Sequence, residues 1–483
     1  MAKAMEEMRG AATVEDGILL SKTVSLCPEC LRRIPAKRIA RGDTVYMEKT
    51  CPEHGAFRTK IWQGLPTFTT WVRPKIPGKI QHPYTEVKRG CPYDCGLCPS
   101  HRQHTCTAVI EVTQRCNLHC TFCFADAGGA SQDPDLETVR SYFQSLLNAG
   151  GTPNVQISGG EPTMRDDLPE IVAMGREMGF PFIQLNTNGL RLSRDRRYLE
   201  ALKVAGLDSI FLQFDGTEPE IFHKMRGGNY LSQKLDTIRQ CGELGIGVVL
   251  VPTVVPGVND HNIGSLIQLA LEWMPAVKGV HFQPASYFGR VPHAPTDEER
   301  ITLPEVLQRM EEQTAGLIKM ESFRPSGCEN AMCSFHGNFI LMAKDEVMAI
   351  TKHDPAKACC APPEEAVTGA KKAREFVSTH WAVTGSASQS CGCFGSCDSD
   401  AEYGANEGAG AEPGSLDFFL ERARSYSLTI SGMAFMDAWN FDLERIMDCC
   451  IHTVAPDGKV IPFCAYNVTD RNGKSLYRGQ VAP

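Results

Sequence analysis

Three cysteines in one short stretch, Cys116, Cys120 and Cys123, have the spacing of ligands to an iron–sulfur cluster. Three thiolates at intervals of four and three residues can hold three corners of a [4Fe–4S] cube, and no fourth cysteine follows locally. Clusters that only transfer electrons normally have four protein ligands. The pattern therefore predicts a cluster with one iron open to a small molecule, shielded from water by Phe122. Zinc is the alternative, although zinc sites usually show a fourth ligand close by.

A Gly-Gly-Glu-Pro turn follows the next predicted strand, at Gly159, Gly160, Glu161 and Pro162. Adjacent glycines allow the backbone to approach a ligand closely, and the Glu161 carboxylate can accept hydrogen bonds from a ligand's ammonium group. Polar residues also end the later strands, where they can contact the rest of such a ligand: Asn186, Asn188, Gln213 and Asp215. Such residues beside glycine are also typical of plain turns, and that interpretation stays open here.

The remaining cysteines also indicate metal. The chain has 21 cysteines in tight clusters, which in a reducing compartment favours metal ligands over disulfides. A ribbon-like spacing near the N-terminus predicts a mononuclear zinc or iron site. Its ligands are Cys27, Cys30, Cys51 and His54.

Two auxiliary sites are predicted beside these. The first is a four-thiolate site that suits a [4Fe–4S] cluster, with zinc as the alternative; its cysteines are Cys91, Cys95, Cys98 and Cys106. The second is a conjectural cluster whose ligands lie far apart in the sequence. Its candidates are Cys328, Cys333, Cys450 (or its neighbour Cys449) and Cys464.

Elements of alternating type position these motifs. Six strand-like segments occupy residues 108–113, 155–158, 182–188, 209–214, 246–255 and 279–284. Five helix-like segments separate them, at residues 136–148, 168–178, 195–205, 231–244 and 263–273. Such alternation predicts an α/β fold with a parallel sheet, either doubly wound or a partial (β/α)6 barrel. In both folds chemistry sits at the carboxyl ends of the strands, where the cysteine loop and the Gly-Gly-Glu-Pro turn fall.

Over residues 108–290 these motifs resemble the radical S-adenosylmethionine (SAM) superfamily. The resemblance implies a partial barrel in which SAM binds the open iron through its amino and carboxylate groups, with the Gly-Gly-Glu-Pro turn holding the amine. It also implies one-electron reduction by a donor such as ferredoxin or flavodoxin, and a 5′-deoxyadenosyl radical that abstracts hydrogen from an unactivated carbon.

The wider pattern of CPEC…CPEHG, CPYDCGLC and CCIH…PFCAYN resembles the tetraether lipid synthase-like radical SAM proteins, some of which are labelled pterin methylases. This resemblance implies carbon–carbon coupling of lipid chains with help from an auxiliary cluster, and contact with a membrane surface. The alternative is C-methylation of a small pterin-like substrate. A third interpretation, an electron-transfer protein, needs neither the Gly-Gly-Glu turn nor an open iron.

The predicted organisation has seven parts: a flexible tail (1–20), a metal ribbon (21–64), an auxiliary-cluster segment (65–107), the barrel (108–290), a first C-terminal extension (291–351), an irregular insertion (352–413) and a C-terminal auxiliary-cluster segment (414–483). The insertion's cysteines suit either a soft-metal site or a disordered appendage. They are Cys359, Cys360, Cys391, Cys393 and Cys397.

Composition limits the partners. A net charge of −8 argues against nucleic acid, because surfaces that bind phosphate need a basic excess. No apolar run is long enough to span a membrane and the N-terminus lacks a signal sequence, so we expect a cytoplasmic protein. Residues 282–288, 433–441 and 461–463 are candidate walls of a lipid channel, with ordinary core packing as the alternative.

Overall fold

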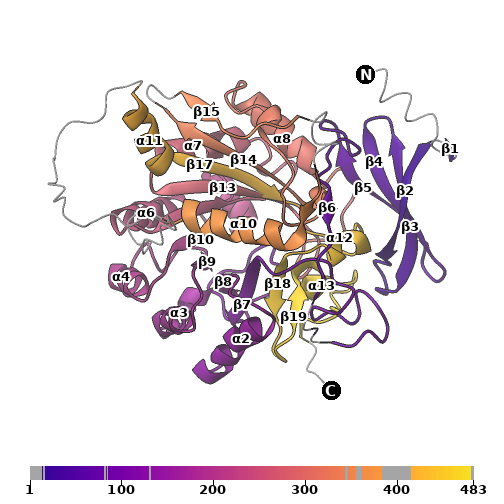
Figure 1. Cartoon of the computed structure of the whole chain (residues 1–483), viewed down its shortest axis with the longest axis horizontal. Helices are drawn as coiled ribbons and strands as arrows, with labels where there is room; N and C mark the ends of the chain where they lie inside the picture. Colours follow the sequence, from indigo (N-terminus) through magenta and orange to yellow (C-terminus); the bar gives the residue numbers. More distant parts are fainter. Residues whose placement is uncertain are drawn as a thin grey trace.

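A computed structural model describes residues 13–14, 17–80, 83, 85–129, 132–342, 346–354, 362–382 and 415–479. Its centre is a run of six parallel strands in sequence order, which confirms the partial barrel with cysteine-rich extensions at both ends (Figure 1). The strands are β7 (Thr107–Thr113), β8 (Asn154–Gly159), β9 (Ile183–Thr187), β10 (Ser209–Gln213), β11 (Gly247–Val251) and β13 (Val277–Pro284). A short strand, β12 (Thr253–Val254), also pairs with β13.

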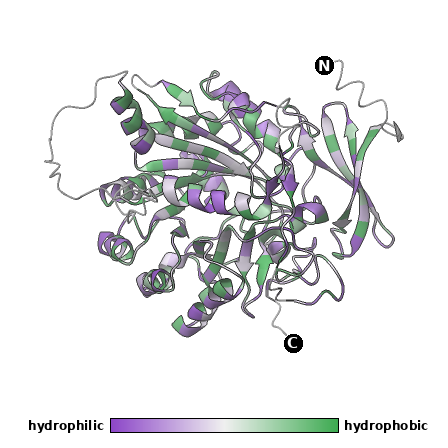
Figure 2. Cartoon of the chain, in the orientation of Figure 1, coloured by the Kyte–Doolittle hydropathy of each residue, from purple (hydrophilic) through white to green (hydrophobic). Residues whose placement is uncertain are grey.

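Helices cover the outer face of this sheet at the predicted places. They are α2 (Leu136–Asn148), α3 (Leu168–Glu177), α4 (Arg196–Val204), α6 (Leu231–Glu243) and α7 (Ile263–Glu272), with one further helix, α5 (Pro219–Arg226). Helix α2 shows why they form: Asp135 caps it by accepting a hydrogen bond from the Thr138 amide, and its apolar residues recur at helical spacing on one buried face. Figure 2 shows hydrophobic and hydrophilic residues alternating around these helices.

The C-terminal part of the chain extends the barrel sheet at both edges. Beyond β13, strand β17 (Ser427–Met433) pairs in parallel, followed by antiparallel β14 (Ser334–Leu341) and β15 (Val347–Ala349). On the other side, β18 (Ile451–Val454) pairs in parallel with β7 and antiparallel with β19 (Val460–Pro462). The accompanying helices are α8 (Leu303–Gln313), α11 (Leu416–Ser425), α12 (Leu443–Met447) and α13 (Phe463–Asn467).

The N-terminal ribbon is a separate antiparallel sheet, seen on the right of Figure 1. Its strands are β1 (Thr13–Val14), β2 (Gly17–Leu26), β3 (Arg33–Arg41), β4 (Thr44–Cys51) and β5 (Gly55–Gln63). The prediction of a flexible tail over residues 1–20 is wrong for residues 17–20, because they pair with β3 as the first part of β2. The ribbon docks on the C-terminal segment through a buried ion pair between Arg38 and Asp442.

The prediction of an irregular insertion is also wrong where the structure describes that region. Residues 364–365 form strand β16 (Glu364–Glu365), which pairs with β6 (Lys75–Ile76), and helix α10 (Ala366–His380) follows. The small residues Ala366, Gly369 and Ala370 form the buried face of α10, so this helix can pack closely on its neighbours. Cys359, Cys360, Cys391, Cys393 and Cys397 lie outside the described residues.

Helix α10 crosses the amino ends of the barrel strands, opposite the end that carries the cysteine loop (Figure 1). The Asn154 amide at the start of β8 donates to the Arg374 carbonyl at 3.2 Å. Trp381, directly after α10, packs with Phe211, Val249 and the other members of an apolar cluster inside the barrel. The barrel interior is therefore closed at one end by a helix and opens toward the cysteine loop at the other. Within the described residues, no helix is long and apolar enough to cross a membrane.

Candidate active site and metal centres

The cysteine loop borders a cavity of about 550 Å³ that runs through the barrel interior. Cys116, Cys120 and Cys123 all line it, together with Gly159 and Gly160. The three thiols and the two adjacent glycines thus border one cavity.

The two glycines are required by close packing against the cysteine loop. A Cβ on Gly159, whose φ is +133°, would lie 2.1 Å from the Thr113 carbonyl oxygen, and a Cβ on Gly160 would lie 2.3 Å from that of Arg115. The Gly160 and Glu161 amides donate to these same two carbonyls at 2.8 Å each. The turn and the start of the cysteine loop thus form one hydrogen-bonded unit.

The Glu161 carboxylate is buried and already holds four donors. One oxygen accepts hydrogen bonds from the Thr163 amide at 3.1 Å and from the hydroxyls of Thr163 and Thr187 at 2.6 and 2.7 Å. The other accepts from the Asn188 amide at 2.7 Å. We expected this carboxylate to receive a ligand's ammonium group, but in the structure it joins the ends of β8 and β9. Glu161 still lines the cavity beside Gly159 and Gly160.

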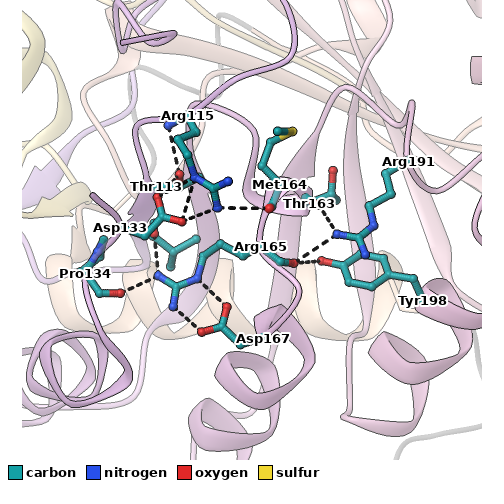
Figure 3. Close-up of polar contacts among 11 residues, drawn as sticks. Thr113, Arg115, Asp133, Pro134, Thr163, Met164, Arg165, Asp167, Arg191 and Tyr198 are labelled. Atoms are coloured by element: carbon teal, nitrogen blue, oxygen red, sulfur yellow. Dashed lines mark hydrogen bonds and ion pairs between the residues drawn. The ribbon is translucent and has the colours of Figure 1, made fainter. Parts of the chain in front are cut away.

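A second layer of charged residues supports the turn from behind (Figure 3). Arg115 is paired with Asp133 and also donates to the Met164 carbonyl at 3.1 Å. Arg165 is paired with Asp167 and donates to the carbonyls of Val112 at 2.9 Å and Pro134 at 2.6 Å. Arg191 and Tyr198 donate to the carbonyls of Thr163 and Arg165 at 2.8 and 2.6 Å. These contacts hold the short 3₁₀ turn Pro162–Met164 in place.

Three of the four polar strand-end residues line the cavity, and one does not. Asn186, Asn188 and Gln213 border it. The Asn188 side chain donates through Nδ2 to Asn117 Oδ1 of the cysteine loop at 2.8 Å. Asp215 is fully buried and makes a bidentate ion pair with Arg226, at 2.7 Å for both contacts. The prediction that Asp215 faces a ligand is therefore wrong, because a buried carboxylate needs this cationic partner.

The N-terminal group is brought together as predicted. The ligand atoms of Cys27, Cys30, Cys51 and His54 all lie within 4.8 Å of one another, between two hairpin turns of the ribbon. His54 Nδ1 is 3.5 Å from Cys51 Sγ and 3.7 Å from Cys27 Sγ. This arrangement suits one tetrahedral ion with three sulfur ligands and one nitrogen ligand.

The grouping predicted for Cys106 is wrong. Its sulfur lies within 4.8 Å of those of Cys328 and Cys450, because the pairing of β18 with β7 places Cys450 beside it; the Cys106 amide donates to the Cys450 carbonyl at 2.9 Å. This buried trio also lines the large cavity. Cys450, rather than Cys449, is thus the residue of that pair that joins the trio.

The other cysteines divide into two further neighbourhoods. Cys91, Cys95 and Cys98 line a small cavity of about 10 Å³ beside His101. The structure divides the third predicted cluster: Cys328 and Cys450 join Cys106, whereas Cys333 and Cys464 interact electrostatically with Cys449, the alternative to Cys450 in that prediction. Arg445 Nε donates to Cys333 Sγ at 3.3 Å.

Comparison with known proteins identifies the core. The radical SAM superfamily model matches residues 110–270, and a model of the HMPTM N-terminal zinc ribbon domain matches residues 19–63. The 7,8-dihydro-6-hydroxymethylpterin dimethyltransferase of Methanocaldococcus jannaschii is 37% identical over 484 residues, which cover 93% of this chain and 94% of that protein. The chain belongs to the radical SAM superfamily.

Other radical SAM relatives match a smaller part of this chain. The GTP 3′,8-cyclase of Alkaliphilus oremlandii is 32% identical over 189 residues, covering 38% of this chain and 58% of its own length. Among solved structures, Streptococcus suis SuiB bound to S-adenosylmethionine covers 44% of this chain and 45% of its own, with 15% identity and a TM-score of 0.35.

A radical SAM enzyme uses a [4Fe–4S] cluster and SAM, and the chemistry of the cavity suits both. Burial raises the pKa of Cys116 to about 11, so a bound metal is needed to hold this sulfur as a thiolate at neutral pH. The auxiliary cysteine groups can hold further clusters or zinc.

Polar side chains also line the otherwise largely apolar cavity, a feature that the sequence analysis missed. Alternate residues of the barrel strands point into it, among them Gln156, Gln184 and His281. Gln156 donates to Gln184 at 2.8 Å, and His281 Nδ1 lies 2.8 Å from the Ser431 hydroxyl. Burial lowers the pKa of His281 to about 4, so its imidazole is neutral at physiological pH. The period-two pattern of polar residues in 154–158 and 184–186 is the signal that predicts this lining.

Several buried polar atoms of the same wall have no hydrogen-bond partner in the structure. These are Asn154 Oδ1, Asn186 Oδ1 and Trp381 Nε1. A buried polar atom without a partner costs roughly 1–3 kcal/mol. Binding of a ligand that offers donors and acceptors would recover part of this cost once the side chains adjust to it.

Proposed function

We propose that this radical SAM enzyme C-methylates a pterin-like heterocycle. The observation that carries the proposal is a set of polar side chains inside the barrel, where amides and a neutral imidazole border the same cavity as the three cysteines of the loop. In support, the Methanocaldococcus jannaschii relative, 94% of which is covered by the match to this chain, is named for dimethylation of a dihydropterin. A cavity of about 550 Å³ falls within the range of roughly 300–1,000 Å³ common for small-molecule sites.

The cavity offers hydrogen-bonding groups for the edge of a flat heterocycle and aromatic side chains for its face. Gln156, Gln184 and Asn186 are placed to pair with ring nitrogens and exocyclic groups, because amides both donate and accept hydrogen bonds. Phe211 and Trp381, whose rings stack with centroids 6.1 Å apart, provide an aromatic wall at the end closed by α10. We infer that the heterocycle lies in this part of the barrel.

Lipid coupling has no support from the comparisons. Of the apolar residues that we considered for a lipid channel, some are packed in the core, such as Phe282 and Trp439, whereas others line the cavity, such as Phe288 and Phe463. Long alkyl chains would also have to displace water from the amides around Gln184 without replacing those hydrogen bonds, which is unfavourable. We therefore favour the small heterocycle, and the expectation of membrane contact is dropped with the lipid.

The proposal assigns cofactor roles to the residues above. Cys116, Cys120 and Cys123 would hold the SAM-cleaving cluster, with the backbone of Gly159 and Gly160 against SAM. When bound, the cluster and one SAM molecule would supply the 5′-deoxyadenosyl radical that abstracts hydrogen from the pterin carbon, and a second SAM molecule, with one further electron, would supply the methyl group that takes its place. The polar side chains proposed to contact SAM or substrate are Asn186, Asn188 and Gln213. A small electron carrier of the ferredoxin or flavodoxin class would supply the electron.

The other cysteine groups would hold supporting metal. We assign the ribbon group to one zinc or iron ion, and the trio of Cys106, Cys328 and Cys450 to an auxiliary site that faces the substrate cavity. Cys91, Cys95 and Cys98 would hold a second auxiliary cluster. A fourth ligand for each auxiliary site would come from the neighbouring Cys333, Cys449 or Cys464.

The test is anaerobic reconstitution with iron, sulfide, SAM and reductant, with 7,8-dihydro-6-hydroxymethylpterin as substrate. We expect 5′-deoxyadenosine together with a pterin whose mass increases by one or two CH₂ units. Cys120→Ala should abolish both products while retaining iron at the other sites. Unchanged pterin together with coupled chains from a lipid extract would refute the proposal and restore lipid coupling.

A further inference from the structure

We propose that Arg226 is a positioning residue that raises the reduction potential of the SAM-cleaving cluster by holding a buried positive charge against Cys120. This inference rests on the assignment of Cys116, Cys120 and Cys123 as cluster ligands, and it does not depend on which substrate is methylated. It assigns a redox role to an arginine outside the cysteine motif.

The guanidinium of Arg226 lies between the cysteine loop and a buried carboxylate. Its side chain is 5% exposed and lines the cavity, whereas its partner Asp215 is fully buried and does not. Nε and Nη2 each contact Asp215 at 2.7 Å, while Nη1 donates to the Phe122 carbonyl at 3.2 Å. The same guanidinium interacts with the Cys120 thiol. The cationic end of the pair therefore faces the loop.

The position of Arg226 relative to the loop is fixed by the backbone. Arg226 is the last residue of helix α5, and the two residues before it contact the loop directly. The Thr121 amide donates to the Met225 carbonyl at 3.1 Å, and the Thr121 hydroxyl donates to the Lys224 carbonyl at 3.0 Å. Helix α5 and the loop are thus joined through backbone carbonyls, and the guanidinium itself is held by its bonds to Asp215 and to the Phe122 carbonyl.

The physical effect follows from charge and burial. Reduction adds one negative charge to a cluster, and a nearby cation stabilises the reduced form. The interaction is stronger in a buried site than in water, because the effective dielectric constant is lower. Asp215 offsets part of the effect, but it is fully buried and does not line the cavity. Lys234 and Glu161 are the other ionisable groups nearby.

Arg290 provides a matched control on the opposite side of the same loop. It also lines the cavity, and its Nε donates to the Cys120 carbonyl at 3.0 Å while both terminal nitrogens donate to the Ala127 carbonyl at 3.1 Å. Its charge is shared with Asp126, which is 61% exposed, at 3.4 Å. Arg290 therefore holds the loop backbone from a position that is more exposed to solvent than that of Arg226.

The experiment is a redox titration of the reconstituted full-length enzyme, monitored by electron paramagnetic resonance. The relevant cluster is recognised because its signal changes when SAM is added. We expect Arg226→Gln to shift its potential to more negative values, Asp215→Asn to shift it to more positive values, and Arg226→Lys to stay near wild type. Arg290→Gln should leave the potential nearly unchanged, and iron content is measured for every variant.

The outcomes separate the two roles of Arg226. Equal potentials in Arg226→Gln and wild type, or an equal shift in Arg290→Gln, would overturn the proposal. Loss of the SAM-responsive cluster from Arg226→Gln, with an unshifted potential in Asp215→Asn, would leave Arg226 as an anchor only and would also overturn it. A wild-type protein without a SAM-responsive cluster would contradict the ligand assignment itself, whatever the result with the pterin.

Discussion

Several carboxylates near this site are bound by neighbouring protein groups. Glu161 is the clearest case, because its carboxylate accepts four hydrogen bonds from Thr163, Thr187 and Asn188. Asp215 is similar, since its carboxylate is bound to Arg226. The sequence shows that carboxylates follow the strand ends, but it does not show which of them meet a buried cation. That depends on neighbours contributed by other strands and by α5.

The close approach of the turn to the cysteine loop makes a specific prediction for Gly160. Gly160→Ala would place a methyl group 2.3 Å from the Arg115 carbonyl oxygen, and overpacking of this kind costs typically 1–3 kcal/mol. We expect a lower free energy of unfolding, measured by urea unfolding, and weaker SAM binding, measured by equilibrium dialysis. Gly129→Ala, nearby in the chain with no atom within 4 Å of its added Cβ, is the control and should behave as wild type.

The buried Lys234 makes a prediction about pH. Its ammonium donates to the Asn188 carbonyl at 2.9 Å and to Gln213 at 3.0 Å, and burial lowers its pKa from 10.5 to about 7. Between these values the unfolded chain binds more protons than the folded protein, so the free energy of unfolding rises with pH by up to about 1.4 kcal/mol per unit. Below pH 7 both states are protonated and the contribution is constant.

Lys234→Met removes this titration. Relative to the variant, the wild-type protein should gain stability as pH increases from 7 toward 10, with no relative change below pH 6. Urea unfolding of both proteins at pH 6, 7, 8 and 9 measures the difference. Parallel stability curves over this range would show that Lys234 keeps its charge in the folded protein.

Secondary-structure elements were predictable where their partners are adjacent in sequence. The six barrel strands and their helices follow local periodicity, and the hydrophobic pattern of 136–148 matches α2 residue for residue. The edge strands were missed because their pairing is non-local: β18 pairs Ile451 with Thr107, across most of the chain. The error on Cys106 has the same origin, since sequence spacing placed it with Cys98 and β18 places it with Cys450.

A side chain on the inner face of β9, Gln184, allows a test between a pterin and a lipid substrate. Gln184→Met preserves volume while removing the hydrogen bonds to Gln156 and to the Ser209 hydroxyl at 3.2 Å. If Gln184 pairs with a heterocycle, kcat/KM for the pterin should fall roughly 10- to 100-fold, the equivalent of one to two lost hydrogen bonds. SAM cleavage without substrate should persist. A variant that methylates the pterin at the wild-type rate would place the ring elsewhere in the cavity.

At the scale of the whole molecule, the ribbon and the C-terminal segment form one body with the barrel. Lys49 of the ribbon donates to the Ala438 carbonyl at 2.7 Å, and Arg38 reaches both Asp442 and Glu444 at 2.6 Å. The Asp442 carboxylate also accepts from the Thr23 hydroxyl at 2.9 Å. The chain thus returns, near its C-terminus, to the ribbon with which the described structure begins. Loss of the ribbon metal should therefore weaken the contacts around Asp442 as well as the ribbon.

The two acidic partners of Arg38 allow this docking to be measured. The Asp442 side chain is 3% exposed and that of Glu444 is 51% exposed, yet both contact the same guanidinium nitrogen. Removing one partner of a buried pair costs about 3–5 kcal/mol, while an exposed pair contributes at most about 1 kcal/mol.

We expect Asp442→Asn to lower the free energy of unfolding several-fold more than Glu444→Gln. Hydrogen exchange should localise the loss to β2, β3 and α12, with the barrel strands still protected. Equal costs for the two variants would show that the ribbon docks through its apolar contacts alone, and that Arg38 is solvated whether or not the ribbon is in place.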